Sequence, residues 1–341
     1  MSTHLAPEPV APAEGEVVEL TYREAIRAAL AEELRHDPTV LLMGEDVATA
    51  GGVFKTNEGL PEEFGAERIF NTPICENGFL GVALGMAVTG LRPVVEIMFS
   101  DFLPTAADAF VNEFPKYRFM SGGQCHVPVT VRSIGGATGR FGTQHSATGE
   151  SWYMGLPGLK VATAGTPASA YGVLRAAIRD DDPVLFFEHK GLYSRKGQVT
   201  LGDGGLLPVG KAGVLHEGTD LTVVSTLLMA DRSLQAATAL AEEGVSAEVV
   251  ELRWLRPLDL DAVIASVEKT GRLLVVEEQV HAGGWGATVI SELTMRGVEM
   301  ARPQALGLRD DMLVAYSPTL EDAMLPSVEG IAGRVRAMLE G

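Results

Sequence analysis

The sequence predicts an α/β protein of two domains, and two observations support this fold class. From Glu19 onward, short runs rich in Val and Ile alternate with helical patterns, as in a mostly parallel sheet covered by helices. At 341 residues the chain can form two domains of ordinary size. Around residues 194–210 the composition turns to Gly, Lys, Asp and Pro, which indicates the connection. We therefore expect a flexible tail at 1–16, a first domain at 17–200 and a second at 201–341.

The elements of the first domain follow from the spacing of apolar residues. A helix over Thr21–His36 begins at a capping Thr21, with Glu24 three residues on. A second helix, over Gly78–Ala87, is rich in small residues that allow tight packing on a sheet. The strands are continuous apolar runs, typical of strands buried on both faces: Val40–Met43, Ile69–Ile74, Val94–Phe99, Val127–Arg132, Leu159–Ala162 and Val184–Glu188.

The second domain repeats the alternation. Its last helix is expected over Leu320–Leu339, and a Gly-rich stretch at 283–286 opens another helix. The remaining elements are strands at Leu221–Ser225, Ala247–Leu252 and Leu273–Glu277, with helices at Ala230–Glu243 and Asp259–Thr270.

Composition limits the function classes. A net charge of −18 disfavours a nucleic-acid backbone or an anionic membrane as partner, because like charges repel. No apolar run approaches the ~20 residues that cross a bilayer. The first twenty residues lack Lys and Arg, which fits neither a secretory signal nor an Arg-rich transit peptide. Two cysteines, Cys75 and Cys125, do not suggest a disulfide framework. The sequence thus predicts a cytoplasmic protein that binds proteins or small molecules.

The stretch Thr72-Pro-Ile-Cys-Glu-Asn-Gly-Phe79 is the most informative. It places one carboxylate, Glu76, between the end of a strand and a Gly-rich helix start. Ligands of α/β proteins bind at the carboxyl ends of the strands, so Glu76 is a candidate functional acid. The alternative is an acid that only favours the positive end of the helix dipole.

Two glycine motifs resemble parts of cofactor-binding loops. Gly202-Asp-Gly204 can open a magnesium-diphosphate motif, which needs an Asn some 25–30 residues later; every asparagine here lies upstream, at positions 57, 71, 77 and 112. A linker turn is the better interpretation. Gly283-Gly-Trp-Gly286 lacks the full dinucleotide-binding spacing, so close helix packing explains it better. The sequence also has no P-loop, H-E-x-x-H or G-x-S-x-G motif, which excludes the reactions that these motifs support.

One histidine stands out. His145 lies in Gly142-Thr-Gln-His-Ser146, a loop between strands where an exposed side chain suits function as well as structure. His189 and His281 each follow a strand that ends in carboxylates, and a structural role is expected for both. The others, His4, His36, His126 and His216, are expected to be solvated.

Taken together, the motifs resemble the beta subunit of the thiamine-diphosphate-dependent decarboxylating component of 2-oxoacid dehydrogenase complexes. The resemblance runs from about Val17 to the C-terminus, and its order and spacing are specific. Besides the Glu76 stretch, it is carried by Leu42-Met-Gly-Glu-Asp-Val47, Gly90-Leu-Arg-Pro-Val-Val-Glu-Ile-Met98, Met120-Ser-Gly-Gly123, Gln144-His-Ser146, Pro157-Gly-Leu-Lys160 and Leu252-Arg-Trp-Leu-Arg-Pro-Leu-Asp259. It implies a thiamine-diphosphate-binding domain of the pyrimidine type followed by a transketolase-type C-terminal domain.

The resemblance implies roles for five residues. Glu76 is expected to share a proton with the aminopyrimidine ring of thiamine diphosphate, which favours the imino form that activates the cofactor. Asp would be too short for this contact. Ile74 and Phe102 are expected to contact the pyrimidine; an ordinary core role is the alternative for Phe102. Glu45 corresponds to a second acid near the subunit interface, and His145 to a histidine that steers substrate or assists acyl transfer.

It also implies partners and ions. An alpha subunit would complete the cofactor site in an α2β2 heterotetramer and hold the magnesium, in agreement with the missing Asn. A lipoyl acyltransferase would bind through its peripheral subunit-binding domain. Potassium binding through backbone carbonyls is a further expectation, with a solvated acidic turn as the alternative; the candidate residues are Val127, Val129, Ala177, Asp180 and Asp182.

The substrate stays open at this point. The resemblance covers enzymes for pyruvate, branched-chain 2-oxo acids and acetoin, and the beta sequence is a poor guide because the alpha chain supplies much of the substrate pocket. Residues such as Cys75 and Asn77 depart from common patterns in the family. A mainly structural subunit that anchors the complex to the acyltransferase is the rival hypothesis.

Overall fold

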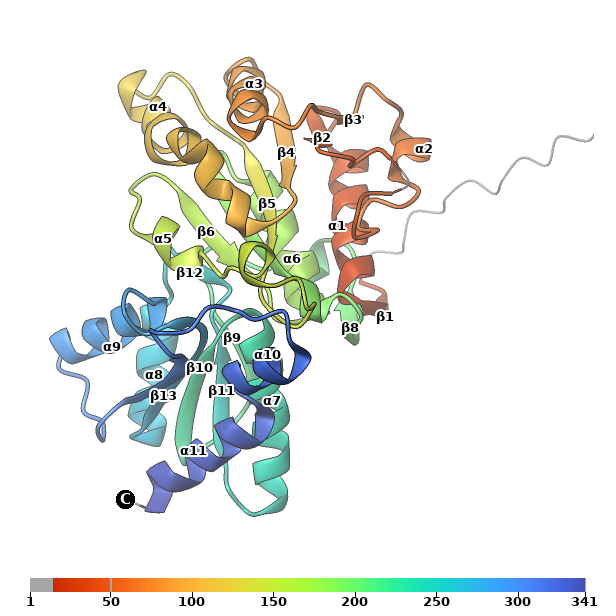
Figure 1. Cartoon of the computed structure of the whole chain (residues 1–341). Helices are drawn as coiled ribbons and strands as arrows, with labels where there is room; N and C mark the ends of the chain where they lie inside the picture. Colours follow the sequence, from red (N-terminus) through yellow and green to blue (C-terminus); the bar gives the residue numbers. More distant parts are fainter. Residues whose placement is uncertain (1–14, 50, 341) are drawn as a thin grey trace, which may run out of the picture.

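A computed structural model describes residues 15–49 and 51–340, and it confirms the expected α/β fold with two bodies, each built on its own main sheet (Figure 1). The predicted tail lies outside the described residues except for Gly15 and Glu16, which hydrogen bond to Leu201. Strand β1 (Val17–Thr21) pairs antiparallel with β8 (Lys196–Thr200). The predicted connection at 194–210 therefore contains a strand.

The first body is a seven-stranded sheet in the order β12-β6-β7-β5-β4-β2-β3. All neighbours are parallel except β12, which runs antiparallel to β6. Strand β12 comes from the second half of the chain, so it joins the two bodies. The strands are β2 (Val40–Gly44), β3 (Ile69–Asn71), β4 (Arg92–Ile97), β5 (Thr130–Gly135), β6 (Lys160–Thr163), β7 (Val184–His189) and β12 (Trp254–Arg256).

Helices cover both faces of this sheet, which explains why its strands are apolar throughout. Along β2, Leu42 packs into the core on one side and Met43 into the core on the other. The first core contains α1 (Tyr22–His36) and α6 (Pro167–Arg179). The second contains α3 (Glu76–Val88), the 3₁₀ segment η1 (Ser100–Ala106), the π segment η2 (Ala109–Glu113) and α4 (Phe114–Met120). Shorter elements are α2 (Leu60–Phe64), α5 (Glu150–Met154), η3 (Thr143–His145) and η4 (Lys190–Leu192).

The cap of the first helix is as the sequence predicts. The Thr21 hydroxyl accepts the backbone N–H of Glu24, and the Glu24 carboxylate accepts the backbone N–H of Thr21 at 2.8 Å. Two of the four orphan N–H groups at a helix start are satisfied in such a box.

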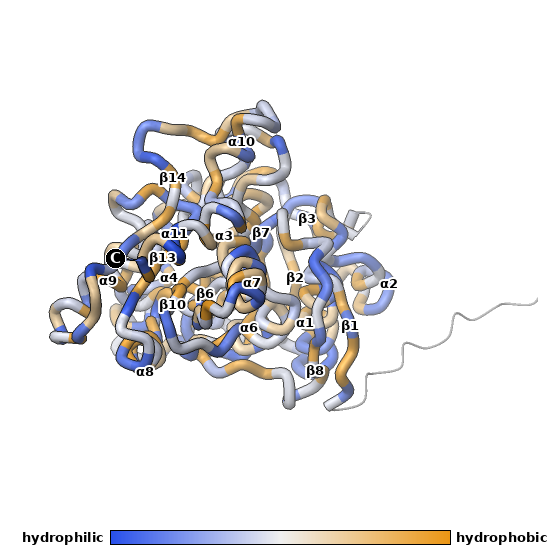
Figure 2. The backbone as a smooth tube through the Cα atoms, turned by 90° about the horizontal axis from the view of Figure 1, so that it is seen from below, coloured by the Kyte–Doolittle hydropathy of each residue, from blue (hydrophilic) through white to orange (hydrophobic). Residues whose placement is uncertain are grey.

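The second body is a five-stranded sheet in the order β14-β13-β10-β11-β9, parallel except for β9. Its strands are β9 (Gly213–His216), β10 (Leu221–Ser225), β11 (Ala247–Glu251), β13 (Leu273–Val280) and β14 (Gln304–Leu308). Its helices are α7 (Leu227–Glu242), α8 (Leu260–Thr270), α9 (Trp285–Met295), α10 (Pro318–Met324) and α11 (Val328–Glu340). Hydrophilic segments gather in turns on the periphery of the molecule (Figure 2).

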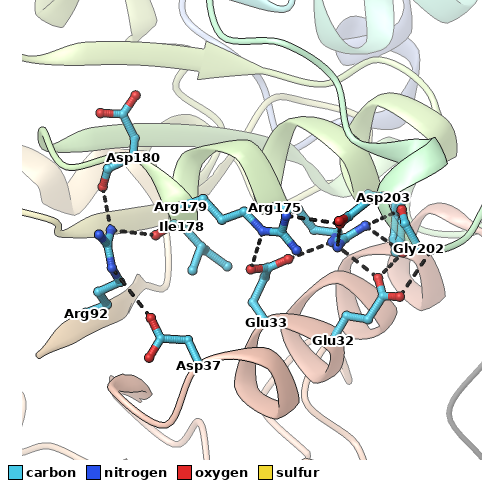
Figure 3. A network of polar contacts seen from close by, with 11 residues as sticks. Glu32, Glu33, Asp37, Arg92, Arg175, Ile178, Arg179, Asp180, Gly202 and Asp203 are labelled. Atoms are coloured by element: carbon cyan, nitrogen blue, oxygen red, sulfur yellow. Dashed lines mark hydrogen bonds and ion pairs between the residues drawn. The ribbon is translucent and has the colours of Figure 1, made fainter.

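Both glycine motifs have structural roles. In the Gly283–Gly286 segment, a Cβ on Gly286 would come within 2.5 Å of Val275, so α9 packs directly on the sheet, as expected. Gly202 precedes the 3₁₀ turn η5 (Asp203–Gly205), and Arg175 binds both the Gly202 carbonyl and the Asp203 carboxylate (Figure 3). The Gly-Asp-Gly segment is thus held against α6.

Several sequence expectations are wrong in their bounds. The strand expected at Val94–Phe99 is Arg92–Ile97, the strand expected at Leu273–Glu277 continues to Val280, and the helix expected from Ala230 begins at Leu227. The strand expected at Ile69–Ile74 ends at Asn71, and the strand expected at Val127–Arg132 begins only at Thr130. Pro128 lacks an N–H for a sheet ladder, which agrees with the later start. The helix expected at Leu320–Leu339 is two helices, α10 and α11. Pro326 stands between them and cannot extend α10 because its ring and missing N–H disrupt helix bonding.

Candidate active site

The carboxyl ends of β2 and β3 bring two predicted residues to the same edge of the sheet. Glu45 directly follows β2, and Glu76 begins α3 shortly after β3. The two connecting loops are tied together. The Asn71 side chain accepts the backbone N–H of Ala48 at 2.8 Å and donates to the Thr49 hydroxyl at 2.6 Å.

The carboxyl of Glu45 is affected by the charge of Glu76. Its pKa is raised, first by partial burial and then by the negative charges of Glu76 and Asp46. Both carboxyls are half-buried. Beside them the Ile74 side chain is 83% exposed, an apolar group with no core to fill. This edge therefore presents two acids next to an exposed apolar side chain.

His145 and Phe102 also meet. The ring of His145 lies edge-to-face against Phe102, with centroids 5.5 Å apart, and against Phe99 at 4.8 Å. Phe99 and Phe102 themselves are 5.9 Å apart in a T-shaped pair. Segment η1, which carries Phe102, packs against both α3 and η3. The predicted residues therefore come from neighbouring elements at one end of the sheet.

A buried ion network lies in the strands beneath this end. The Arg132 guanidinium binds Glu188 at 2.6 Å and Glu96 at 2.9 Å, and all three side chains are almost completely buried. Tyr193 donates to Glu188 at 2.9 Å, and Asn57 donates to Glu96 at 3.3 Å. Burial disfavours the charged guanidinium, yet the two carboxylates more than offset it, so the pKa of Arg132 is raised. Sequence reasoning missed this network; polar residues within apolar strands were the available signal.

A second polar cluster joins the two bodies. His189, at the end of β7, contacts Glu278 of β13 through Nε2 at 2.9 Å. Its Nδ1 accepts the N–H of Gly191, so Nε2 carries the proton and donates to the carboxylate. Glu278 also accepts the backbone N–H of Ala137 at 2.6 Å. His189 is fully buried, in agreement with the expected structural role, and Nδ1 of His281 lies 3.2 Å from a carboxylate oxygen of Glu277.

Glu150, near these groups, is a buried acid with no cation against it. Its Oε2 atom has no hydrogen-bond partner among the described residues. Burial, with smaller contributions from the negative charges of Glu278 and Glu277, raises its pKa to about 7. The folded chain therefore keeps a proton here that an unfolded chain releases near pH 4.5.

We predict that Glu150→Gln stabilises the protein at pH 8 but not at pH 4.5. The stability linked to this proton is fully present below about pH 4.5 and is lost as pH rises through about 7. A neutral amide removes that loss of stability, which is worth roughly 3 kcal/mol at pH 8. Urea unfolding of both proteins between pH 4.5 and 8 measures it, with the exposed Glu62→Gln as control. Parallel pH profiles of wild type and Glu150→Gln would show that the folded protein does not retain this proton.

The candidate cation site is strongly engaged by the protein's own cations. Lys160 binds Asp180 at 2.6 Å and Asp182 at 3.0 Å, and Arg118 binds Asp182 at 2.6 Å. Arg92 donates to the Asp180 carbonyl at 2.9 Å (Figure 3). Ala177 lies in the last turn of α6, and the carbonyls of Ala177, Val127 and Val129 each accept one backbone N–H. The carboxylates of Asp180 and Asp182 already pair with Lys160 and Arg118. A bound metal cation would therefore have to use the second lone pair of each of these backbone carbonyl oxygens.

Comparison with known proteins agrees with this arrangement. Residues 18–196 match the Transketolase, pyrimidine binding domain family, and residues 210–331 match the Transketolase, C-terminal domain family. Among solved structures, a split gene transketolase in an inactive beta4 tetramer superposes with a TM-score of 0.76. That superposition covers 94% of this chain and 98% of the other, and at 23% identity it shows the fold alone.

Sequence relatives are more specific. The pyruvate dehydrogenase E1 component subunit beta of Rhizobium meliloti is 40% identical over 97% of this chain and 72% of its own length. The 2-oxoisovalerate dehydrogenase subunit beta of Bacillus subtilis is 38% identical, over 94% of this chain and 99% of the relative. The acetoin:2,6-dichlorophenolindophenol oxidoreductase subunit beta of Cupriavidus necator is 38% identical, over 94% and 98%. These similarities run along nearly the whole chain, and the chain therefore belongs to the family of beta subunits of 2-oxoacid dehydrogenase E1 components.

Proposed function

We propose that this chain is the beta half of a thiamine-diphosphate-dependent 2-oxoacid dehydrogenase, which decarboxylates a 2-oxo acid and passes the acyl group to a lipoyl group. The observation that carries the proposal is the acid pair Glu45 and Glu76 at the carboxyl ends of β2 and β3, with Ile74 exposed beside it. When bound, thiamine diphosphate supplies the carbon nucleophile and the electron sink for decarboxylation.

Each residue has a distinct task in this proposal. A carboxyl oxygen of Glu76 holds a proton against the aminopyrimidine ring nitrogen, and a shorter Asp would leave the 2.6–3.2 Å range that proton sharing needs. Glu45 is the second acid at this edge, and burial together with the charges of Glu76 and Asp46 raises its pKa. Phe102 offers a flat apolar face to the pyrimidine. His145, set against Phe102, steers the substrate or the lipoyl group.

The chain is proposed to act only with an alpha subunit, in an α2β2 heterotetramer. The sequence has no Asn downstream of Gly202-Asp-Gly204, so a magnesium-diphosphate site must come from another polypeptide. The lipoyl acyltransferase component is the further partner, through its peripheral subunit-binding domain. A cytoplasmic setting fits the two free thiols of Cys75 and Cys125. Among the described residues no helix could span a membrane.

Reconstitution tests the proposal. Oxidation of pyruvate, branched-chain 2-oxo acids and acetoin by an artificial acceptor is measured with thiamine diphosphate and magnesium, first for this chain alone and then with its alpha partner. Activity only in the mixture is expected, and the preferred substrate then separates the 2-oxo acid reaction from acetoin cleavage, which the Cupriavidus necator relative makes the second candidate. Activity of the chain alone would refute the split site. An assembled but inactive tetramer would favour a structural subunit.

A separate experiment tests potassium binding. We propose that potassium binds backbone carbonyls between Val127 and Val129 and at the end of α6. The melting temperature of the protein is measured in potassium chloride and in sodium chloride of equal concentration, which needs no assay of turnover. A higher melting temperature in potassium supports the site, and equal values argue that Lys160, Arg118 and Arg92 already satisfy the turn.

A further inference from the structure

Lys190 is a half-buried cation that the proposed chemistry does not use. It begins η4 at the carboxyl end of β7, the same edge of the sheet that carries Glu45 and Glu76. Its ammonium has no carboxylate within ion-pair distance among the described residues. Burial lowers its pKa to about 8, against the smaller opposing effect of Glu278, Asp101 and Glu321. A half-buried ammonium group without a carboxylate nearby needs other hydrogen-bond acceptors as its partners.

Those partners are the two ends of one loop. The Nζ atom donates to the carbonyl of His145 at 2.6 Å and to the carbonyl of Gly136. The ammonium also lies 5.4 Å from the ring centre of Phe141 and 6.0 Å from that of Phe99. An ammonium has three donors and no acceptor, so one side chain can bridge two carbonyls. Contact with the ring faces partly compensates its lost hydration.

The bridged loop is the segment 136–145, which ends in the candidate catalytic histidine. Its first residue, Gly136, has a φ of +81°, and a Cβ there would overlap His189, so only glycine fits. The N–H of Gly136 donates to the carbonyl of Ala147 at 3.1 Å. The Thr143 hydroxyl donates to the carbonyl of Val314 in the second body at 3.0 Å. The second body also accepts the N–H groups of Ala137 and Thr138 through Glu278 and Glu321, and Arg140 pairs with Glu321. The loop is thus closed at its base and attached to the second body along its length.

None of these contacts reaches the ring of His145. Among the described residues, the ring makes edge-to-face contacts with Phe99 and Phe102 and no hydrogen bond. Its backbone N–H donates to the carbonyl of Gly142 within the same loop at 3.3 Å, and its carbonyl is the atom that Lys190 holds. Lys190 also lies near Phe99, which the His145 ring touches. One cation therefore holds both the backbone of His145 and the base of its loop at a fixed distance from the aromatic surface.

We propose that Lys190 is the positioning residue of the active-site loop: by bridging the carbonyls of Gly136 and His145 it holds the His145 ring against Phe99 and Phe102. The functional consequence rests on the proposed role of His145, whereas the structural consequence does not. Without the ammonium two carbonyls lose a charged donor, and the loop has a lower cost of opening.

Hydrogen–deuterium exchange on the reconstituted tetramer tests the structural consequence. In Lys190→Met, amides of residues 137–146 should exchange at least roughly tenfold faster, because two charge-assisted hydrogen bonds are lost and one alone corresponds to about this factor. Amides of α1 should be unaffected. Lys190→Arg should restore slow exchange, because it keeps a cation with several donors. Lys190→Gln serves as a second neutral variant if Lys190→Met does not fold.

Lys160→Met is the matched control, since Lys160 is also a partly exposed lysine but lies at the opposite end of the sheet, paired with Asp180. It should leave loop exchange unchanged. Unchanged exchange of 137–146 in both neutral Lys190 variants would overturn the proposal. So would faster exchange spread equally over the whole chain without rescue by Lys190→Arg, which would make Lys190 a general stabilising group.

Turnover separates this inference from the proposed function. Lys190→Met should lower kcat about tenfold with little change in KM for the 2-oxo acid, and Lys190→Arg should recover most of it. If His145→Ala leaves turnover and acyl transfer unchanged, the proposed role of His145 fails, and the exchange experiment still decides whether Lys190 holds the loop. Selective loop opening without any effect on kcat would retain the bridge and overturn its functional consequence.

Discussion

Glu76→Gln in the reconstituted tetramer is expected to lower turnover by about two to four orders of magnitude, the typical contribution of a positioned proton donor or acceptor. An amide has nearly the size of the carboxyl but cannot share its proton with a ring nitrogen. Artificial-acceptor oxidation of the preferred 2-oxo acid measures the loss. Size-exclusion chromatography should show unchanged assembly, because Glu76 has no ion pair or hydrogen bond to another described residue that the change would remove.

Two further variants make this result specific. Glu76→Asp keeps the charge but shortens the side chain by one methylene, so it should also lose most activity. Glu67→Gln, an exposed acid just before β3 at the other end of that strand, should behave as wild type. Full activity of Glu76→Gln would remove this residue from the mechanism and favour a purely structural subunit.

Arg132→Met is expected to destabilise the fold by about 3–5 kcal/mol, the cost of leaving buried charge without its partner. Glu96 and Glu188 would then face each other in a completely buried setting without a cation. Equilibrium unfolding in urea gives the free energy. Arg118→Met removes a surface ion pair with Asp182 and should cost less than about 1 kcal/mol.

A double variant identifies the cause. Adding Glu188→Gln to Arg132→Met removes one of the two unpaired charges, so part of the lost stability should return. If Arg132→Met instead stays within about 1 kcal/mol of wild type, the carboxylates must take up protons at little cost, and the network would not be a major contributor to stability.

Much of the fold could be predicted from local pattern. Runs such as Val184–Glu188 and Leu221–Ser225 lie within one residue of the observed strands, because strands buried on both faces must be apolar along their length. The cap at Thr21 could be predicted because it depends on two residues that are three positions apart in the sequence. Strands β1, β8, β9, β12 and β14 were missed. Each is short and depends on a partner elsewhere in the sequence, as in the pairing of Val17 with Thr200.

The candidate site likewise contains residues that the sequence singled out and residues that it did not. Sequence motifs singled out Glu45, Glu76, Phe102 and His145, and the structure brings them to neighbouring elements at one edge of a sheet. The roles of these residues stay predictions until the variants are measured. Lys190, Phe99 and Glu278 were not singled out, although Lys190 directly follows a strand that ends at the same edge.

The sequence by itself determined the family, the alternation of strands and helices, and the acid at position 76, because each is encoded in residues close together along the chain. Only the tertiary structure decided which charges are paired. Arg132 meets Glu96 and Glu188, and Lys190 meets the carbonyls of Gly136 and His145, across separations that no local pattern records. The physical reason is that burial makes an isolated charge costly, so each buried ion requires a partner, and the packing of distant strands selects it.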